Sequence, residues 1–155
     1  MIDAYLFDWG DTLMVDFPGV VGKMCDWKVV KAVDGASETL EFLSQSASIY
    51  VATGAAESSE SDIKRAFARV GLDKFMSGYF CESNIGHMKG SPEFLPTILE
   101  HLGLPAKRVA LVGDSFTKDI EPAARIGIHP IWLRSENTPI PAGARAIRSL
   151  RELCI

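Results

Sequence analysis

The sequence predicts an α/β domain built on a doubly wound, mainly parallel sheet of five strands. Two observations support this fold class: short apolar runs alternate with segments of helical period, and glycines end several of the helical segments. Strands that alternate with helices typically form a parallel sheet with helices on both faces. The 155 residues are enough for one hydrophobic core, and we interpret residues 1–155 as a single domain.

The five apolar runs expected to form strands are residues 2–7, 48–52, 79–81, 109–112 and 128–133. Pro130 cannot donate a ladder hydrogen bond, which predicts the last run at an edge of the sheet. Apolar side chains recur at helical spacing in four other segments, namely residues 37–43, 59–71, 94–102 and 120–127. These segments are therefore expected to be the covering helices.

Composition and charge exclude several classes of protein. No apolar run is long enough to span a membrane, and Asp3 and Asp8 interrupt the first run, so we expect neither a membrane partner nor a signal peptide. Cys25, Cys81 and Cys154 lie far apart without metal-ligand spacing, which is typical of a reducing compartment, and we expect a cytoplasmic protein.

The net charge of −4 indicates no nucleic-acid partner. Near the C-terminus, Arg145, Arg148 and Arg151 recur every three residues. We interpret this spacing as the solvated face of a helix.

Polar residues gather directly after the predicted strands. In parallel sheets, ligands bind beyond the carboxyl ends of the strands, near the switch in strand order. The residues at these ends are Asp8, Gly10, Asp11 and Thr12 after the first run, Thr53 and Gly54 after the second, and Gly113, Asp114 and Ser115 after the fourth. Lys89 lies in a loop before a helix. Together these residues form the candidate site.

Two strand-end carboxylates, Asp8 and Asp114, can converge on one hard cation. A carboxylate is costly to bury unless a cation or hydrogen bonds compensate, and Mg²⁺ accepts one or two carboxylates while keeping water and substrate oxygens. Asp119 follows in the next turn, where it can hold a lysine or a metal-bound water. Taken alone, Asp8 would more often cap a turn and Asp114 the next helix; it is their occurrence with Thr12, Thr53, Lys89 and Asp119 in order that favours the metal site.

A hydroxyl and an amide follow the second predicted strand. Thr53 and Gly54 suit the binding of a phosphate oxygen, and Lys89 carries a compensating charge. Strand-end threonines and loop lysines are also common without a function, so neither signal is specific by itself.

The ordered set of motifs resembles the haloacid dehalogenase-like hydrolases. The set comprises DxxxT at residues 8–12, VATG at 51–54, KGSP at 89–92 and GDSFTKD at 113–119, and the last is the most distinctive. The resemblance extends from Tyr5 to about Leu133. It implies a Rossmann-like three-layer sandwich and a phosphatase that acts on a small phosphorylated metabolite.

By position, the resemblance implies that Asp8 is the nucleophile and carries an aspartyl-phosphate intermediate. Thr53 and Lys89 would bind the transferring phosphoryl group and offset its charge, with Thr12 and Gly54 in the same phosphate site.

For the metal, the resemblance implies Mg²⁺ bound by Asp8, Asp114 and the backbone carbonyl of Gly10. Asp119 would support this set.

The first motif departs from the pattern DxDGT that phosphatases of this family usually carry, because it reads Asp8, Trp9, Gly10, Asp11, Thr12. The second aspartate of that pattern protonates the leaving group, and Gly10 cannot do so. Asp11 can substitute if the loop relaxes around Gly10, or it can stabilise the turn instead. Known relatives with replacements at this position include phosphonoacetaldehyde hydrolases and haloacid dehalogenases.

The chain has little room for the helical cap of larger family members. Residues 14–35 are expected to form a short flap, which leaves the site open unless a second subunit of a homo-oligomer covers it. Apolar residues of this segment either line the flap or pack on the core; they are Met14, Val15, Phe17, Met24 and Trp27.

Two other functions remain open. A catalytically weak phosphate- or partner-binding protein would keep the fold and the metal site while lacking the acid at Gly10. A receiver-type signalling domain also phosphorylates an aspartate beside Mg²⁺, but its acceptor usually follows the third strand, whereas Asp8 follows the first.

Overall fold

A six-stranded parallel sheet forms the centre of the computed structural model, which describes residues 1–134, 139–140 and 142–155. The strand order is β3-β2-β1-β4-β5-β6. The strands are β1 (Ala4–Phe7), β2 (Ser48–Ala52), β3 (Gly78–Phe80), β4 (Val109–Gly113), β5 (His129–Leu133) and β6 (Arg145–Ile147). The parallel α/β architecture confirms the predicted fold class.

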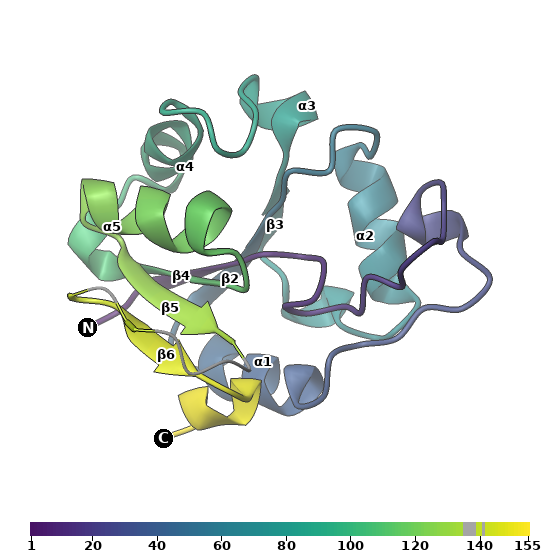
Figure 1. Cartoon of the computed structure of the whole chain (residues 1–155), viewed down its shortest axis with the longest axis horizontal. Helices are drawn as coiled ribbons and strands as arrows, with labels where there is room; N and C mark the ends of the chain where they lie inside the picture. The colour runs from purple at the N-terminus through teal and green to yellow at the C-terminus, as the bar shows by residue number, and fades with distance from the viewer. Residues whose placement is uncertain (135–138, 141) are drawn as a thin grey trace.

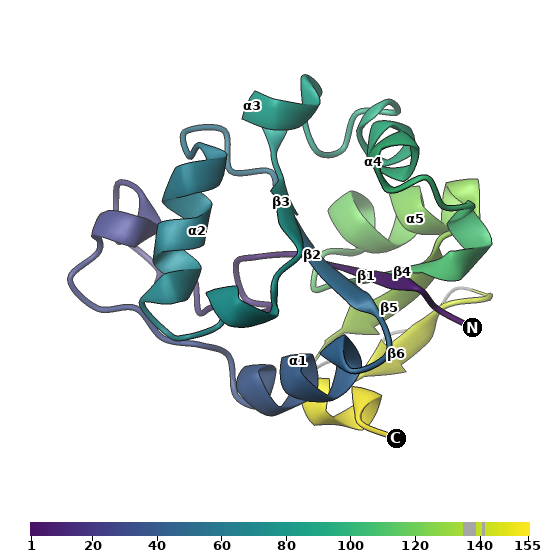
Figure 2. The same ribbon diagram turned by 180° about the vertical axis from the view of Figure 1, so that it is seen from behind.

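Helices cover both faces of this sheet (Figures 1 and 2). One face carries α1 (Ala36–Ser44), α2 (Glu60–Ala68) and the 3₁₀ turn η5 (Leu150–Leu153), and the other carries α3 (Glu82–Ile85), α4 (Phe94–Leu102) and α5 (Glu121–Ile126). Short turns complete the structure: η1 (Met24–Asp26), η2 (Asp73–Phe75), η3 (Ala106–Arg108) and the π-helical turn η4 (Phe116–Ile120). Among the described residues, no helix is long and apolar enough to cross a membrane.

Side chains on the two faces of β1 belong to separate hydrophobic clusters, because successive strand residues point to opposite faces of the sheet. Phe7 packs in the cluster beneath α1 and α2, whereas Leu6 packs in the cluster beneath α4 and α5, and neither side chain is exposed. The central strand is thus buried on both faces, which explains its continuous apolar sequence.

The register of β1 places the strand-end residues side by side. Phe7 pairs with Val51 on β2 and with Val112 on β4. The chain runs outward to β2 and β3 on one side of β1 and to β4, β5 and β6 on the other, so the strand order switches at β1. This switch point is where a doubly wound sheet opens a crevice for a ligand.

The sheet has one strand more than the sequence predicts, and the prediction that β5 lies at an edge is wrong. β6 is only three residues long, and it pairs with β5 from Ile131 onward. Pro130 precedes that pairing, so its missing N–H interrupts no bond to β6. The expected C-terminal arginine helix is also absent from the described residues, because Arg145 lies in β6 and Arg151 lies in the short turn η5.

Residues 14–35 form a short excursion that is anchored on α2, and we call this segment the flap. Its two ends meet, because Met14 bridges to Ala32. Its middle packs on the domain, because Met24 and Trp27 are each only 8% exposed. Met14 is fully buried and Phe17 is partly buried against the same core. Met14, Phe17, Met24 and Trp27 thus pack on the core, and Met24 and Trp27 also line a cavity at the end of the sheet.

Ion pairs and hydrogen bonds hold the flap against α2. Lys23 lies 2.8 Å from Asp62, and Arg65 of α2 lies 3.1 Å from Asp26. Arg69 also donates hydrogen bonds to backbone carbonyls of the flap. The flap is therefore a docked part of the domain rather than a separate cap.

Candidate active site

Asp8 stands at the centre of the candidate site, directly after β1. Its backbone N–H donates to the carbonyl of Val112 at 2.9 Å, which continues the ladder between β1 and β4. Its side chain is 15% exposed and opens into a cavity of about 800 Å³. The two carboxylate oxygens have different partners, Lys89 at Oδ1 and the Thr12 hydroxyl at Oδ2.

Lys89 is a nearly buried cation between two carboxylates. Its side chain is 5% exposed, and its Nζ lies 2.7 Å from Asp8 Oδ1 and 2.6 Å from Asp119 Oδ1. The same nitrogen donates to the carbonyl of Ala52 at the end of β2, at 3.0 Å. The loop before α4 thereby brings its lysine to the ends of two strands, although 81 positions separate Lys89 from Asp8.

Asp119 reaches the site because the chain makes a π-helical turn after β4. Asp119 is fully buried, and its Oδ2 accepts a hydrogen bond from the backbone N–H of Ser115 at 3.1 Å. A Cβ atom on Gly113 would lie 2.2 Å from Asp119 Oδ2, so only glycine fits at the end of β4. Gly113 therefore allows the carboxylate to turn back over the strand end.

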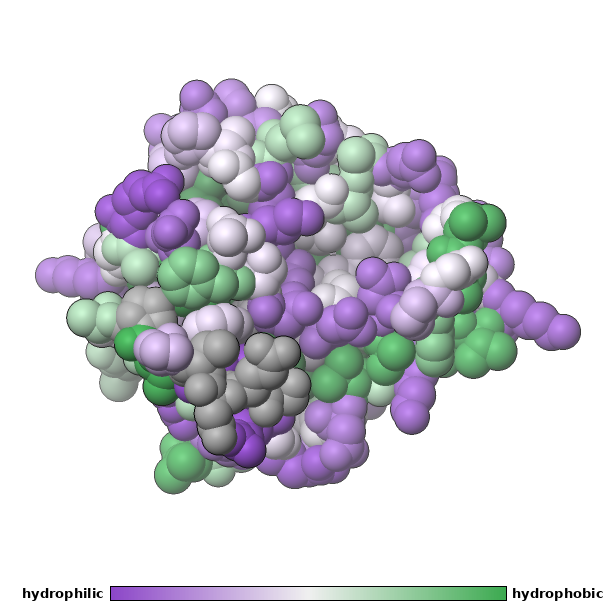
Figure 3. All heavy atoms as spheres, viewed as in Figure 1, coloured by the Kyte–Doolittle hydropathy of each residue, from purple (hydrophilic) through white to green (hydrophobic). Residues whose placement is uncertain are grey.

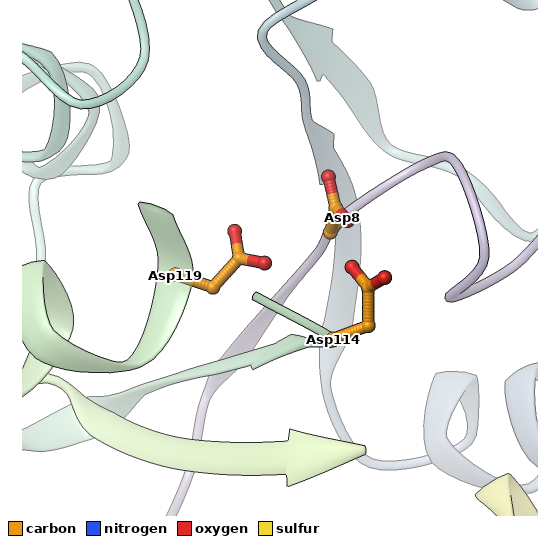
Figure 4. A group of neighbouring side chains, drawn as sticks. All are labelled: Asp8, Asp114 and Asp119. Atoms are coloured by element: carbon orange, nitrogen blue, oxygen red, sulfur yellow. The ribbon is translucent and has the colours of Figure 1, made fainter. Parts of the chain in front are cut away.

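Three carboxylates converge at this edge of the sheet. Oxygen atoms of Asp8, Asp114 and Asp119 all lie within 4.8 Å of one another. Figure 4 shows Asp8 and Asp114 following neighbouring strands and Asp119 extending toward them from the turn after β4. Two of the three also contact Lys89, which is a single positive charge, so the group carries an excess of negative charge.

The pKa shifts in the site reflect burial first and this excess charge second. Burial in the cleft, together with the neighbouring Asp8 carboxylate, raises the pKa of Asp114 to about 7. Burial also raises the pKa of Asp119, against the opposing effect of Lys89. For Lys89, burial lowers the pKa, but the charges of Asp8 and Asp119 outweigh it and the net shift is upward. The site thus favours a cation beyond the lysine.

The donor set fits a hard divalent cation. Carboxylate and carbonyl oxygens at the ends of β1 and β4 are the ligand type that Mg²⁺ takes. The carbonyl of Asp114 accepts a hydrogen bond from the Trp132 indole at 3.2 Å, which holds the loop after β4 in place. The residues present therefore meet the chemical requirement for a metal.

The predicted phosphate-binding residues that follow β2 face the same cavity as Asp8. Thr53 and Gly54 line it together with Lys89. Thr53 is 4% exposed, and its hydroxyl accepts a hydrogen bond from the N–H of Ala55 at 3.1 Å. In Figure 3 the surface of the molecule is hollowed between the flap on one side and the helices on the other.

Thr12 is placed differently from the expectation that it binds substrate phosphate. Its side chain is fully buried and does not line the cavity. Its hydroxyl donates to Asp8 Oδ2 at 3.3 Å, so Thr12 orients the Asp8 carboxylate from the buried side, away from the cavity.

Asp11 occupies a strained turn, with φ at 59°. Its Oδ1 accepts the backbone N–H of Asp16 at 2.9 Å, and its own N–H donates to the carbonyl of Met14 at 2.7 Å. Of the two roles expected for Asp11, these bonds favour the stabilisation of the turn.

Asp16 is a cavity residue that the sequence does not point to. It lies in the flap, six positions beyond Gly10, and belongs to no motif. Its position follows only from the tight loop between Gly10 and Met14, which a linear pattern does not reveal.

The chain matches the model of one known protein family. The family model of the haloacid dehalogenase-like hydrolases matches residues 24–127, a segment that contains Lys89, Asp114 and Asp119 and begins after Asp8. No curated protein matches the chain.

Solved structures of low sequence identity share the fold. An uncharacterized protein from Listeria monocytogenes serotype 4b superposes with a TM-score of 0.84 at 23% identity, covering 97% of this chain and 94% of its own. A haloacid dehalogenase-like phosphatase from Thermococcus onnurineus gives 0.79 at 17%, covering 98% and 96%. A magnesium-bound Bacillus subtilis protein, provisionally assigned as a hydrolase of this type, gives 0.78 at 16%, also covering 98% and 96%.

The doubly wound parallel sheet and the acidic cleft at its switch point define a Rossmann-like α/β protein with a candidate metal-binding active site. More narrowly, the chain belongs to the haloacid dehalogenase-like hydrolases.

Proposed function

We propose that this hydrolase is a Mg²⁺-dependent phosphatase that transfers a phosphoryl group from a small phosphorylated metabolite to Asp8. The observation that carries the proposal is the environment of the Asp8 carboxylate. One oxygen is 2.7 Å from a buried lysine, the other is 3.3 Å from the Thr12 hydroxyl, and the group faces a cavity of about 800 Å³. A carboxylate held in this way can act as a covalent nucleophile.

In this mechanism each neighbour of Asp8 has one task. Thr12 orients the carboxylate from the buried side. Lys89 lies beside the Asp8 carboxylate, where its ammonium group can bind an oxygen of the incoming phosphoryl group and offset its charge. Thr53 and Gly54, at the end of β2, supply a hydroxyl and an amide for the other phosphoryl oxygens. Asp119 holds Lys89 in place from the opposite side.

Asp8, Asp114 and the carbonyl of Gly10 would hold Mg²⁺, with Asp119 in support. When bound, the cation offsets charge on the phosphoryl oxygens. Asp8 then attacks phosphorus, the bond to the leaving oxygen breaks, and water later hydrolyses the aspartyl phosphate to inorganic phosphate.

The flap is held on α2 and lines one side of the cavity, and the entrance is open to small phosphorylated molecules. We also propose a homo-oligomer in which a second copy of the chain covers this entrance. We expect the protein to act in the cytoplasm.

The test is a phosphatase screen of the wild-type protein beside Asp8→Asn, with Mg²⁺ and with EDTA. We expect turnover that needs Mg²⁺ and that falls by at least ~10³-fold in the variant, because Asn cannot form the acyl phosphate. Asp73→Asn is a matched control, because it removes a carboxylate in η2, before β3, that does not line the cavity. Equal turnover by wild type and Asp8→Asn would refute the mechanism.

A second function is favoured by one observation, the glycine at position 10. If the protein only binds phosphate groups or a partner, it should bind beryllofluoride in a Mg²⁺-dependent manner and show no turnover in the same screen. Asp8→Asn should abolish that binding.

A further inference from the structure

The side of Gly10 that lacks a side chain faces Asp16. A Cβ atom built on Gly10 would lie 3.4 Å from Asp16 Cβ and 3.5 Å from Asp16 Oδ2. The Asp16 carboxyl group therefore fills the space into which a side chain at position 10 would extend. Gly10 does not have a positive φ, so its backbone would also accept other residues.

Asp16 also lines the cavity of the proposed nucleophile. Asp8, Gly10, Asp16 and Lys89 all contribute to its wall. Asp16 is an exposed residue, so its carboxyl group is accessible from the solvent.

The turn that contains Asp11 holds Asp16 in this place. Asp11 Oδ1 accepts the backbone N–H of Asp16 at 2.9 Å. One oxygen of the Asp11 carboxylate is thus engaged with the backbone, whereas among the described residues no hydrogen bond engages the Asp16 carboxylate. Both acids line the cavity, but the carboxyl group that faces the side-chain position of Gly10 is that of Asp16.

We propose that Asp16, reaching in from the flap, supplies the proton transfer that Gly10 cannot, and that Asp11 is its positioning residue. The inference rests on the proposed phosphatase function. It assigns a catalytic role to the flap and makes alkyl phosphate monoesters substrates despite the glycine at position 10.

The two half-reactions balance through this one carboxyl group. As Asp8 attacks phosphorus, the bond between phosphorus and the leaving oxygen breaks, and the Asp16 proton passes to that oxygen to release an alcohol. Water then attacks phosphorus, its proton passes to the Asp16 carboxylate, and the bond from phosphorus to Asp8 breaks. Inorganic phosphate leaves, and both aspartates return to their starting states.

The experiment compares kcat/KM, which reports the transfer to Asp8, across phosphate monoesters of rising leaving-group pKa. The series runs from p-nitrophenyl phosphate through phenyl phosphate to an alkyl phosphate. We expect Asp16→Asn to lose ~10²–10⁴-fold on the alkyl ester, where the leaving oxygen needs a proton. The loss on p-nitrophenyl phosphate should be far smaller, because p-nitrophenolate leaves without one.

Two further variants test the assignment. Asp11→Asn keeps an oxygen that can accept the Asp16 N–H, so it should lose less on the alkyl ester than Asp16→Asn. In the double variant Gly10→Asp/Asp16→Ala, the new side chain enters the space that Asp16 vacates, and alkyl ester turnover should recover relative to Asp16→Ala alone.

The outcomes separate this inference from the proposed function. A loss in Asp16→Asn that is uniform across the series, or a larger loss in Asp11→Asn, would overturn the role of Asp16 while Asp8-dependent turnover persists. A folded Gly10→Asp/Asp16→Ala variant that is as slow as Asp16→Ala on the alkyl ester would also overturn the role of Asp16. A wild-type protein without Asp8-dependent turnover would remove the phosphatase function, and this inference with it.

Discussion

The ion pairs of Lys89 couple the stability of the fold to the chemistry of the site. Its Nζ lies within 2.7 Å of both Asp8 and Asp119, and Asp119 has no exposed surface. A buried carboxylate that loses its partner is left as an uncompensated charge, which costs more than the pair itself contributes.

Replacing Lys89 with Met should therefore destabilise the protein by ~3–5 kcal/mol, because Asp119 is then buried without a counter-charge. Adding Asp119→Asn should restore much of that loss. Urea unfolding in buffer with EDTA measures both variants without a divalent cation to compensate. A double variant that is less stable than Lys89→Met alone would contradict this account.

Gly113 is the residue on which the position of Asp119 depends. A Cβ at Gly113 would lie 2.6 Å from Asp119 Cβ as well as 2.2 Å from Oδ2, so rotating the carboxylate cannot relieve the clash. We expect Gly113→Ala to cost ~1–3 kcal/mol and, by moving Asp119, to lower turnover by ~10²-fold. Thermal unfolding and kcat measure the two effects; a variant with wild-type values in both would show that the strand end yields without cost.

At the scale of elements, the flap depends on α2 for its position. The helix begins at a capping box in which Ser59 and Asp62 exchange hydrogen bonds, and the same Asp62 carboxylate pairs with Lys23 of the flap. The hydrogen bond from Lys23 lowers the pKa of Asp62 to about 2 from its ordinary value of 3.8. One carboxylate thus serves both the helix start and the flap.

This pKa shift predicts a pH-dependent contribution to stability. A lowered pKa in the folded state stabilises the protein above the ordinary pKa, and the contribution disappears as pH falls from about 4 toward 2. The difference in melting temperature between wild type and Asp62→Asn should therefore shrink over that range. A difference that stays constant from pH 6 to pH 2 would show that Asp62 acts through packing rather than charge.

At the scale of the whole molecule, the C-terminal residues complete the core beneath α1. Leu150 has no exposed surface and Leu153 is 6% exposed, and both belong to the cluster that includes Leu40 of α1. Arg151 adds ion pairs to Asp34 and Glu38 at the start of α1. The last turn is therefore part of the domain rather than a tail.

Leu150→Ala tests this placement. It should lower the free energy of unfolding by ~2–5 kcal/mol, because the truncation leaves a cavity in the core. Ile155→Ala is the matched control, since Ile155 is 96% exposed and its truncation should change stability by less than ~0.5 kcal/mol. Equal effects of the two substitutions in urea unfolding would argue against a structural role for the C-terminal turn.

The sequence predicts the fold class well because the strand and helix patterns are local. The runs at 48–52 and 94–102 coincide with β2 and α4, where buried side chains alone decide the pattern. β6 escapes prediction because a three-residue strand has no periodicity to read, and its pairing with β5 is a contact between distant segments.

Asp8, Lys89, Asp114 and Asp119 could be selected from the sequence, because each follows a strand or precedes a helix in a distinctive order. What the sequence determined by itself was this order of chemical groups along a parallel sheet. Only the tertiary structure decided how they meet: that Thr12 supports Asp8 from behind, that Asp11 is occupied by the backbone, and that Asp16 faces the empty side of Gly10. The physical reason is that these contacts depend on the three-dimensional course of one loop, whose turn brings residue 16 beside residue 10, and no linear spacing specifies that course.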